Sequence, residues 1–367
     1  MRLVFWQVGL SPHQLPYIVK LLDDERVDEV VVVAEQAVSE ERKKMGWSVE
    51  NIPGLERCMV CVSPQDDVIE SLLATRTKDS VHLFSGIRGF AFIFKCLKMS
   101  LAYPVKRALI TERPNTFVNG FANAKPLWLH HIRFLLQDLK YAKRISYVFA
   151  IGSGAAAYWG RVNKSWKVFP FMYCVLPHAD VEPARLSGPA RFLFVGSLSP
   201  RKAPLTLVNA FAANVGDGGA LTFVGDGKER PKVEAAVKKH GLEGRVSIAG
   251  FRPLTEVPRW LAQSDVLVLP SVYDGWGAVV NEALQMGLYV ICSDACGASD
   301  LLRGDKRLGV VFKKGDEGGL ASAMGHCMSH IEQIRGERQY RLRWADSHIS
   351  GEVVARYMVD CLSGEVS

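Results

Sequence analysis

The sequence predicts an α/β protein built of two doubly wound domains, and three observations lead to this prediction. Short apolar runs rich in β-branched residues recur along the chain, such as Val27–Ala34 and Val266–Leu269. They alternate with segments of helical spacing, which is typical of parallel sheets covered by helices. The length of 367 residues, with 48% hydrophobic and 23% charged residues, suits two folded domains better than one.

In the first half, residues 1–170 are predicted to form one domain. Strands are expected at Met1–Val8, Val27–Ala34, Met59–Val62, Asp79–Gly86, Ala108–Thr111 and Val148–Gly152, with helices at Pro16–Leu22 and Val68–Ala74. From Phe169 to Pro189 the chain is expected to be irregular and proline-rich, so residues 171–190 are predicted to be the linker.

Residues 191–345 are predicted to form the second domain. Strands are expected at Arg191–Gly196, Leu221–Val224, Val246–Phe251, Val266–Leu269 and Tyr289–Cys292, with helices at Pro204–Ala213, Arg230–His240, Val257–Ala262 and Ala278–Met286. Residues 346–367 are predicted to be a helix that returns to the first domain.

The stretch from Ser264 to Leu302 dominates the functional interpretation. It reads as a strand, a turn with two glycines, a helix closed by Gly287 at its C′ position, and a second strand. The helix start offers free N–H groups and a partial positive charge, which suit a phosphate. Two carboxylates, Asp274 and Glu282, frame this start with seven residues between them. An ordinary βαβ unit with surface acids is the alternative interpretation.

This pattern resembles the donor-site signature of the retaining GT-B glycosyltransferases of family 4 (glycosyl transferases group 1). The resemblance implies two facing Rossmann-like domains with a deep cleft between them. It also implies that the first acid contacts the donor sugar, that the turn holds sugar and diphosphate, and that the second acid accepts from the ribose. The family usually has Glu at the first position, where this chain has Asp274. The residues so implicated are Asp274, Gly275, Trp276, Gly277, Ala278, Val279 and Glu282.

Other parts of the second half extend the resemblance. Ser197–Lys202 resembles the family pattern Gly-Arg-Leu-x-x-x-Lys-Gly, whose Arg and Lys grip the diphosphate. Lys202 falls on the family Lys, Ser197 replaces the family Arg, and Arg201 is expected to supply the missing charge. Further binding residues implied are Asp226 in a Gly-Asp-Gly turn, and Phe251 and Arg252 near the base.

The first half departs from the family. The loop after the first strand carries Gly9 without the usual Gly-Gly, and Gly9 is expected to approach the donor. No His stands near the reaction centre in the corresponding stretch 109–114, where Glu112 is either a substrate contact or half of a structural ion pair. His82 is interpreted as a packed residue at a strand end rather than a catalytic one.

The positive charge of the chain is concentrated in one region. Residues 80–170 carry a balance of +12, with Glu112 and Asp138 as their only acids, against +7 for the whole chain. Basic amphipathic stretches at 90–103 and 130–144 predict that residues 88–144 contact an anionic membrane. For the second stretch taken alone, the expectation is a helix that packs its stripe of Ile132, Leu135, Leu136, Leu139 and Ala142 on the sheet, and membrane contact is predicted for the whole basic region. Nucleic acid is not expected as a partner, because no reader module accompanies the charge.

The sequence therefore predicts a retaining glycosyltransferase that takes a sugar from a nucleotide-diphosphate sugar, UDP-linked by preference and GDP-mannose next. The expected acceptor is a lipid-linked or cell-surface glycan, as in lipopolysaccharide or exopolysaccharide synthesis. No metal and no cofactor are expected. Scattered cysteines, no leader and no membrane span lead us to expect a cytoplasmic protein, with peripheral contact at the inner face of the plasma membrane as an option. The alternatives are a non-catalytic, membrane-associated component of a polysaccharide assembly complex, a sugar-nucleotide epimerase or phosphorylase of the same fold, and a nucleic-acid-binding protein.

Overall fold

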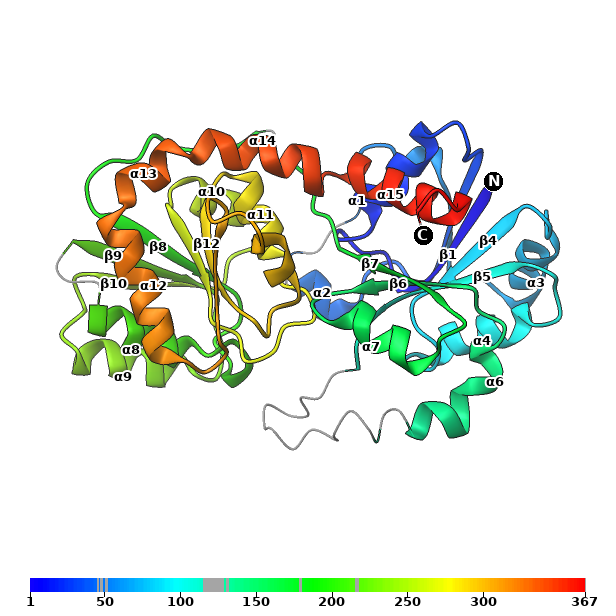
Figure 1. Ribbon diagram of the computed structural model, residues 1–367, viewed down its shortest axis with the longest axis horizontal. Helices are drawn as coiled ribbons and strands as arrows, with labels where there is room; N and C mark the ends of the chain where they lie inside the picture. Colours follow the sequence, from blue (N-terminus) through cyan, green and yellow to red (C-terminus); the bar gives the residue numbers. More distant parts are fainter. Residues whose placement is uncertain are drawn as a thin grey trace. The chain divides into compact units, whose positions relative to one another are not determined.

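The computed structural model describes residues 1–44, 46, 49, 52–114, 129, 132–177, 180–214 and 218–366 (Figure 1). The described chain forms two compact units. The first runs to Leu176 and resumes at Ser350, and the second is Pro177–Ile349. Within the described residues, no helix is both long and apolar enough to cross a membrane.

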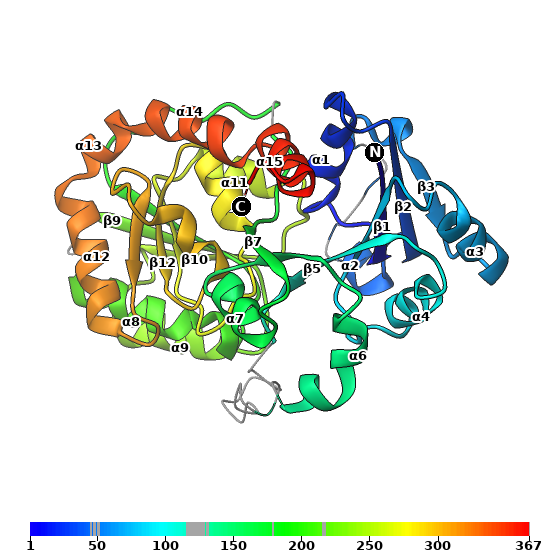
Figure 2. The same cartoon turned by 45° about the vertical axis from the view of Figure 1, so that its right-hand side comes forward.

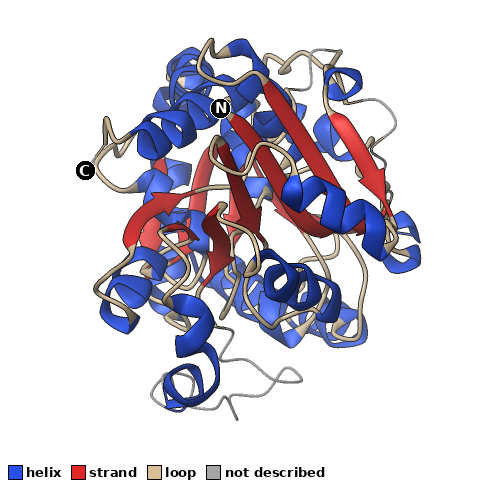
Figure 3. Cartoon of the chain, turned by 90° about the vertical axis from the view of Figure 1, so that its right-hand side faces the viewer, coloured by secondary structure: helices blue, strands red, loops and turns tan. Residues whose placement is uncertain are grey.

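The first unit is built on a seven-stranded parallel sheet of order β3-β2-β1-β4-β5-β6-β7. Its strands are β1 (Arg2–Gly9), β2 (Glu29–Gln36), β3 (Met59–Val62), β4 (Ser80–Phe84), β5 (Lys106–Glu112), β6 (Tyr147–Ile151) and β7 (Lys167–Phe171). Its helices are α1 (Leu15–Ile18), α2 (Glu40–Lys44), α3 (Asp66–Ala74), α4 (Ala91–Ser100), α6 (Leu139–Ala142), α7 (Ala155–Val162) and α15 (Gly351–Ser363). Helices lie on both faces of these strands (Figure 3).

The burial of this sheet explains its strands. Leu3 to Trp6 of β1 and Val30 to Ala34 of β2 are almost completely buried, as expected where helices cover both faces of a parallel sheet. One core joins β1, β2, β4, β5 and β6 to α3, α4 and α7. On the other face α1 packs against α15, and the Tyr17 ring meets the Phe5 ring edge-on at 6.5 Å.

Two sequence predictions for this unit are wrong. Strand β7 occupies residues predicted to be irregular, and it accommodates Pro170 because an edge strand needs fewer N–H donors. Of the predicted apolar stripe, Ala142 is buried and Leu139 packs against the core, but Ile132, Leu135 and Leu136 are exposed. The expectation that the whole stripe packs on the sheet is therefore wrong. Residues 130 and 131 of that prediction, and 115–128 of the predicted membrane-contact region, lie outside the described residues. So do residues 178 and 179 of the predicted linker.

The second unit is built on a six-stranded parallel sheet of order β10-β9-β8-β11-β12-β13. Its strands are β8 (Ala190–Val195), β9 (Gly219–Val224), β10 (Val246–Gly250), β11 (Val266–Leu269), β12 (Tyr289–Ser293) and β13 (Gly309–Phe312). Its helices are α8 (Pro204–Asn214), α9 (Arg230–Lys239), α10 (Val257–Ala262), α11 (Val279–Gln285), α12 (Glu317–Ser329), α13 (Ile331–Gly336) and α14 (Arg338–Ile349). Helices α8, α9 and α12 pack on one face, with α10, α11 and α14 on the other (Figure 2).

The helix ends follow from local chemistry. Gly287 follows α11 with φ +72°, which confirms its predicted role as a C′ glycine. The final helical segment divides into α14 and α15 at Ser350, whose hydroxyl accepts from the Val353 N–H at the start of α15. Beyond Ser350 the chain belongs to the first unit.

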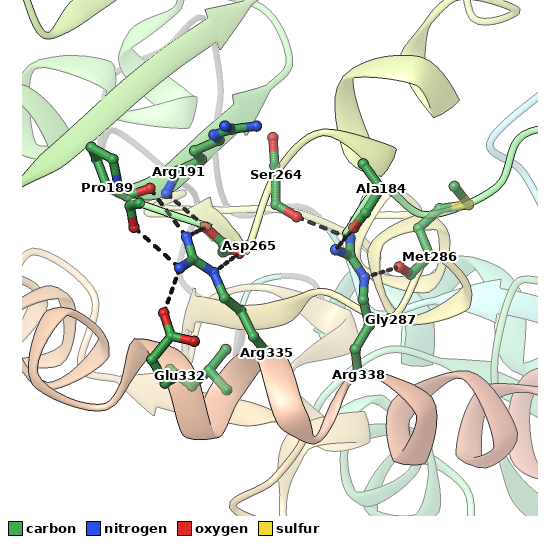
Figure 4. A network of polar contacts seen from close by, with 12 residues as sticks. Ala184, Pro189, Arg191, Ser264, Asp265, Met286, Gly287, Glu332, Arg335 and Arg338 are labelled. Carbon is green, nitrogen blue, oxygen red and sulfur yellow. Dashed lines mark hydrogen bonds and ion pairs between the residues drawn. The ribbon is translucent and has the colours of Figure 1, made fainter. Parts of the chain in front are cut away.

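A buried ionic network ties α13 and α14 to the amino-terminal ends of β8 and β11 (Figure 4). The Arg335 guanidinium donates to both carboxylate oxygens of Asp265, at 2.9 and 3.0 Å. The same carboxylate accepts from the Arg191 N–H at 2.9 Å. Arg338 donates to the carbonyls of Ala184, Ser264 and Met286. These contacts lie at the amino-terminal ends of the strands. The candidate site lies at the opposite end of the sheet, where the strands have their carboxyl ends.

Candidate functional site

Two cations and one carboxylate meet at the carboxyl ends of β8 and β11. In this strand order the connections diverge between these two strands, which is where doubly wound sheets bind ligands. Lys202 follows β8 in a 3₁₀ turn, and its ammonium pairs with the Asp274 carboxylate that follows β11. Arg201 lies 3.7 Å from the other Asp274 oxygen and donates to the Tyr273 carbonyl at 3.0 Å. Since the Lys202 and Asp274 side chains are 11% and 12% exposed, water screens this pair only weakly.

The turn that carries Asp274 is fixed from behind by the segment after β12. The Cys296 thiol and the Ala298 N–H both donate to the Trp276 carbonyl, at 3.0 and 2.8 Å. Gly277 has φ +91°, and a Cβ there would stand 2.7 Å from the Cys296 sulfur, so only glycine fits. The buried Trp276 indole donates to Asn281 of α11 at 2.8 Å. The Trp276 side chain therefore holds the turn and does not face a ligand.

Glycines bring the loops after β8 and β9 into contact. A Cβ on Gly225 would stand 1.9 Å from the Gly196 carbonyl oxygen, and one on Gly227 would stand 2.4 Å from that of Leu198. Asp226 between them is exposed, accepts from the Gly227 N–H at 2.7 Å and pairs with Arg230 at 2.8 Å. These contacts give Asp226 a turn-stabilising role.

Glu282 stands out as a buried acid. It lies on α11, it is 9% exposed, and no hydrogen bond or ion pair from another described residue reaches its carboxylate. Burial raises its pKa from 4.5 to about 7. A buried acid with a raised pKa and without a partner is a candidate for ligand binding.

The remaining predicted residues of this unit are accessible to different degrees. Gly275, Ala278 and Val279 are half-buried around the helix start, and Ser197 is exposed with its hydroxyl 3.1 Å from that of Ser199. Phe251 is 51% exposed after β10, as a ring available for stacking would be. The Arg252 guanidinium lies 5.9 Å from the Trp260 ring centroid.

Gly9 and Glu112 belong to the first unit. Gly9 ends β1 beside Gln36, and Glu112 ends β5, where its carboxylate accepts from the Tyr173 hydroxyl at 3.2 Å. The sequence had not singled out Tyr173. His82 is fully buried, accepts from the Trp6 indole at 3.1 Å, and has its pKa lowered to about 3 by burial. The interpretation of His82 as a packed residue is confirmed.

No group of three or more His, Cys, Asp or Glu side chains in the described parts of the chain is arranged to hold a metal ion.

The comparison with known families agrees with this arrangement. Residues 189–330, which include the cations, the Gly-Asp-Gly turn, Asp274 and Glu282, match the model of the glycosyl transferases group 1 family. The chain is 30% identical over 171 residues to a 2-deoxystreptamine glucosyltransferase of Streptomyces kanamyceticus. The aligned segment covers 45% of this chain and 44% of the relative. It is 31% identical over 169 residues to the lipopolysaccharide core biosynthesis glycosyltransferase LpsE of Rhizobium meliloti. This alignment covers 45% of this chain and 46% of the relative. The chain thus spans less than half the length of these curated relatives.

Solved structures resemble the chain over its whole length. Anabaena Alr3699/HepE, solved in complex with UDP, superposes with a TM-score of 0.71 at 16% identity, covering 99% of this chain and all of that one. The lipopolysaccharide outer core galactosyltransferase WaaB gives 0.69 at 14% identity over all of both chains. At such identities the likeness concerns the fold, and it confirms the predicted GT-B fold of two Rossmann-like domains. The cleft between the domains stays a prediction.

Proposed function

We propose that this chain is a retaining, metal-independent glycosyltransferase that uses a nucleotide-diphosphate sugar. One observation carries the proposal: within the family-matched segment, Lys202 and Arg201 converge on Asp274 where β8 and β11 end. Two cations beside one carboxylate leave a net positive charge, which suits a diphosphate.

The chemistry required is the cleavage of a sugar–phosphate bond. Negative charge grows on the departing diphosphate, and Lys202 and Arg201 stand where preorganised cations would stabilise it. Asp274 holds the Lys202 ammonium in place before the donor arrives, and it then becomes available to the hydroxyls of the sugar. Glu282 accepts from the ribose hydroxyls, which gives its buried carboxylate hydrogen bonds that no other described residue provides.

The donor and acceptor proposed here draw support from proteins similar to this chain. HepE has been solved with UDP and with UDP-glucose, which favours a UDP-sugar as donor. GDP-mannose is the second candidate, and it follows from the family resemblance alone. LpsE acts in lipopolysaccharide core biosynthesis and AmsK of Erwinia amylovora in amylovoran biosynthesis. We therefore propose a lipid-linked or cell-surface glycan as the acceptor and a cytoplasmic place of action.

Thermal unfolding in the presence of UDP, GDP, ADP and their sugars, with EDTA present throughout, tests the donor site. A nucleotide that binds the folded protein raises its Tm, and we expect UDP to do so without metal. Glu282→Gln should lose this shift, whereas Glu243→Gln, at an exposed position before β10 and so at the opposite end of that strand from Phe251, should keep it.

The outcomes separate the proposal from its alternatives. If no nucleotide shifts the Tm, the chain is better described as a non-catalytic component of a polysaccharide assembly complex. If a UDP-sugar binds but is converted to its epimer or cleaved by phosphate without an acceptor, the chain is an epimerase or phosphorylase. Incubation of a UDP-sugar with isolated lipid-linked glycan, followed by analysis of the products, distinguishes these cases.

A further inference from the structure

An exposed face of the first unit combines apolar and basic side chains. We call it the basic apolar face, and it consists of Ile132, Arg133, Leu135, Leu136, Lys140, Lys143 and Arg144. The three apolar side chains are unusually accessible, at 43% for Ile132, 43% for Leu135 and 80% for Leu136. All four cations are exposed as well.

The opposite side of the same segment is anchored in the core. Phe134 is buried and meets the rings of Trp159 and Trp166 edge-on, with centroids 6.4 and 5.6 Å away. The Trp166 indole donates to the Ala142 carbonyl at 3.0 Å, and Tyr141 packs on Phe94 of α4 at 5.2 Å. Residues 134–138 form a π-helical turn that leads into α6 at the margin of the first unit (Figures 1 and 2). Because Phe134 and Tyr141 are anchored in the core, the side chains of Leu135 and Leu136 stay exposed to solvent.

No acid among the described residues neutralises the charge of this face. Asp138 is the only acid of the segment, and it pairs with Arg88, whose guanidinium also lies 4.7 Å from the Phe94 ring centroid. None of the four cations of the face forms an ion pair with another described residue. Residues 80–170 hold 14 Lys and Arg against two acids, so the face stands in a region of like charge.

We propose that the basic apolar face binds the surface of an anionic lipid bilayer. Leucine and isoleucine side chains insert below the headgroups while lysine and arginine pair with lipid phosphates, the arrangement of interfacial anchors. A protein partner would have to bury four cations and supply matching acids, whereas a bilayer presents anions at any position. Each cation near such a surface raises binding by roughly fivefold, an effect that salt reduces.

Flotation of the full chain with vesicles tests this inference. We expect binding to vesicles of phosphatidylcholine mixed with phosphatidylglycerol, and little binding to phosphatidylcholine alone. The double variant Lys140→Ser/Lys143→Ser should bind the anionic vesicles roughly 25-fold more weakly. Leu135→Ser/Leu136→Ser should also lose binding to the anionic vesicles. Binding should stay lost at high salt, because the missing contribution is the insertion of apolar side chains. The matched control Lys238→Ser/Lys239→Ser removes two exposed lysines from α9 in the second unit and should bind as the parent does.

Several results would overturn the inference: equal binding to neutral and anionic vesicles, no binding to either, or anionic binding that both face variants retain. If light scattering shows that the parent is a dimer and that Leu135→Ser/Leu136→Ser is a monomer, the face instead binds a second copy of the chain. The nucleotide-induced rise in Tm, measured on the same variants, reports the donor site and a folded protein independently. A failure of membrane binding therefore leaves the proposed function standing, and the reverse also holds.

Discussion

Replacing Glu282 by Gln isolates the energetic consequence of burying a carboxyl group without a partner. The side chain keeps its size and shape, and only the ability to ionise is lost. In the folded protein burial raises the Glu282 pKa to about 7 from an ordinary value of 4.5. The unfolded chain has the ordinary value, so the two states bind different numbers of protons between these pH values.

The sign of the effect follows from linkage. Below about pH 4.5 the carboxyl is protonated in both states, and its burial brings no ionisation penalty. As the pH rises from 4.5 to 7, the unfolded chain releases the proton while the folded protein retains it, so stability falls. Above pH 7 the loss is complete, and 2.5 pKa units correspond to about 3 kcal/mol. Glu282→Gln should therefore be about 3 kcal/mol more stable than the parent at pH 8 and nearly equal to it at pH 4.5.

Urea unfolding of both proteins at a series of pH values measures this difference directly. Glu243→Gln serves as the control, because its exposed side chain should leave the pH dependence unchanged. A nucleotide that donates hydrogen bonds to the Glu282 carboxylate should bind the parent more weakly below pH 7. If Glu282→Gln is no more stable than the parent at pH 8, the carboxyl is solvated or paired, and the argument from burial is refuted.

Three further predictions concern other features of the second unit. Asp265→Ala removes the carboxylate that accepts both hydrogen bonds from Arg335. The buried guanidinium left unpaired should lower the free energy of unfolding by about 3–5 kcal/mol. If urea unfolding shows a loss of stability no larger than that caused by Asp305→Ala, at a more exposed acid, this prediction is contradicted. Ala203→Gly relieves a left-handed backbone conformation, φ +51°, at the position of the family glycine after the Lys, and should raise stability by about 0.5–1 kcal/mol in thermal unfolding; a lower Tm would count against it. Lys202→Gln should reduce turnover roughly 100-fold, by the magnitude for one lost transition-state contact, with a smaller change in nucleotide affinity; equal losses in both would assign Lys202 to binding alone.

Most strands and helices were predictable because local patterns determine them, but β13, α12 and α13 were not among the predicted elements. The apolar run at Val266–Leu269 coincides with β11, and the helix of Glu282 ends at Gly287 as predicted. Strand β7 was not predicted, because prolines normally indicate irregular chain and only the position at a sheet edge makes Pro170 acceptable. The exposure of Leu136 was also beyond a periodicity argument, because spacing identifies an apolar stripe but not the surface that covers it.

By itself, the sequence determined the two-domain α/β fold, the resemblance of the second domain to a known family and the residue types at its candidate site, because spacing and turn chemistry can be read along the chain. Only the tertiary structure decided which of those residues meet. It placed Lys202 against Asp274 across 72 positions of sequence and turned the Trp276 side chain inward onto Asn281. It also left Glu282 buried without a hydrogen-bond or ion-pair partner among the described residues. Contacts and burial depend on how strands from distant parts of the chain align in one sheet, and local patterns carry no information about that alignment.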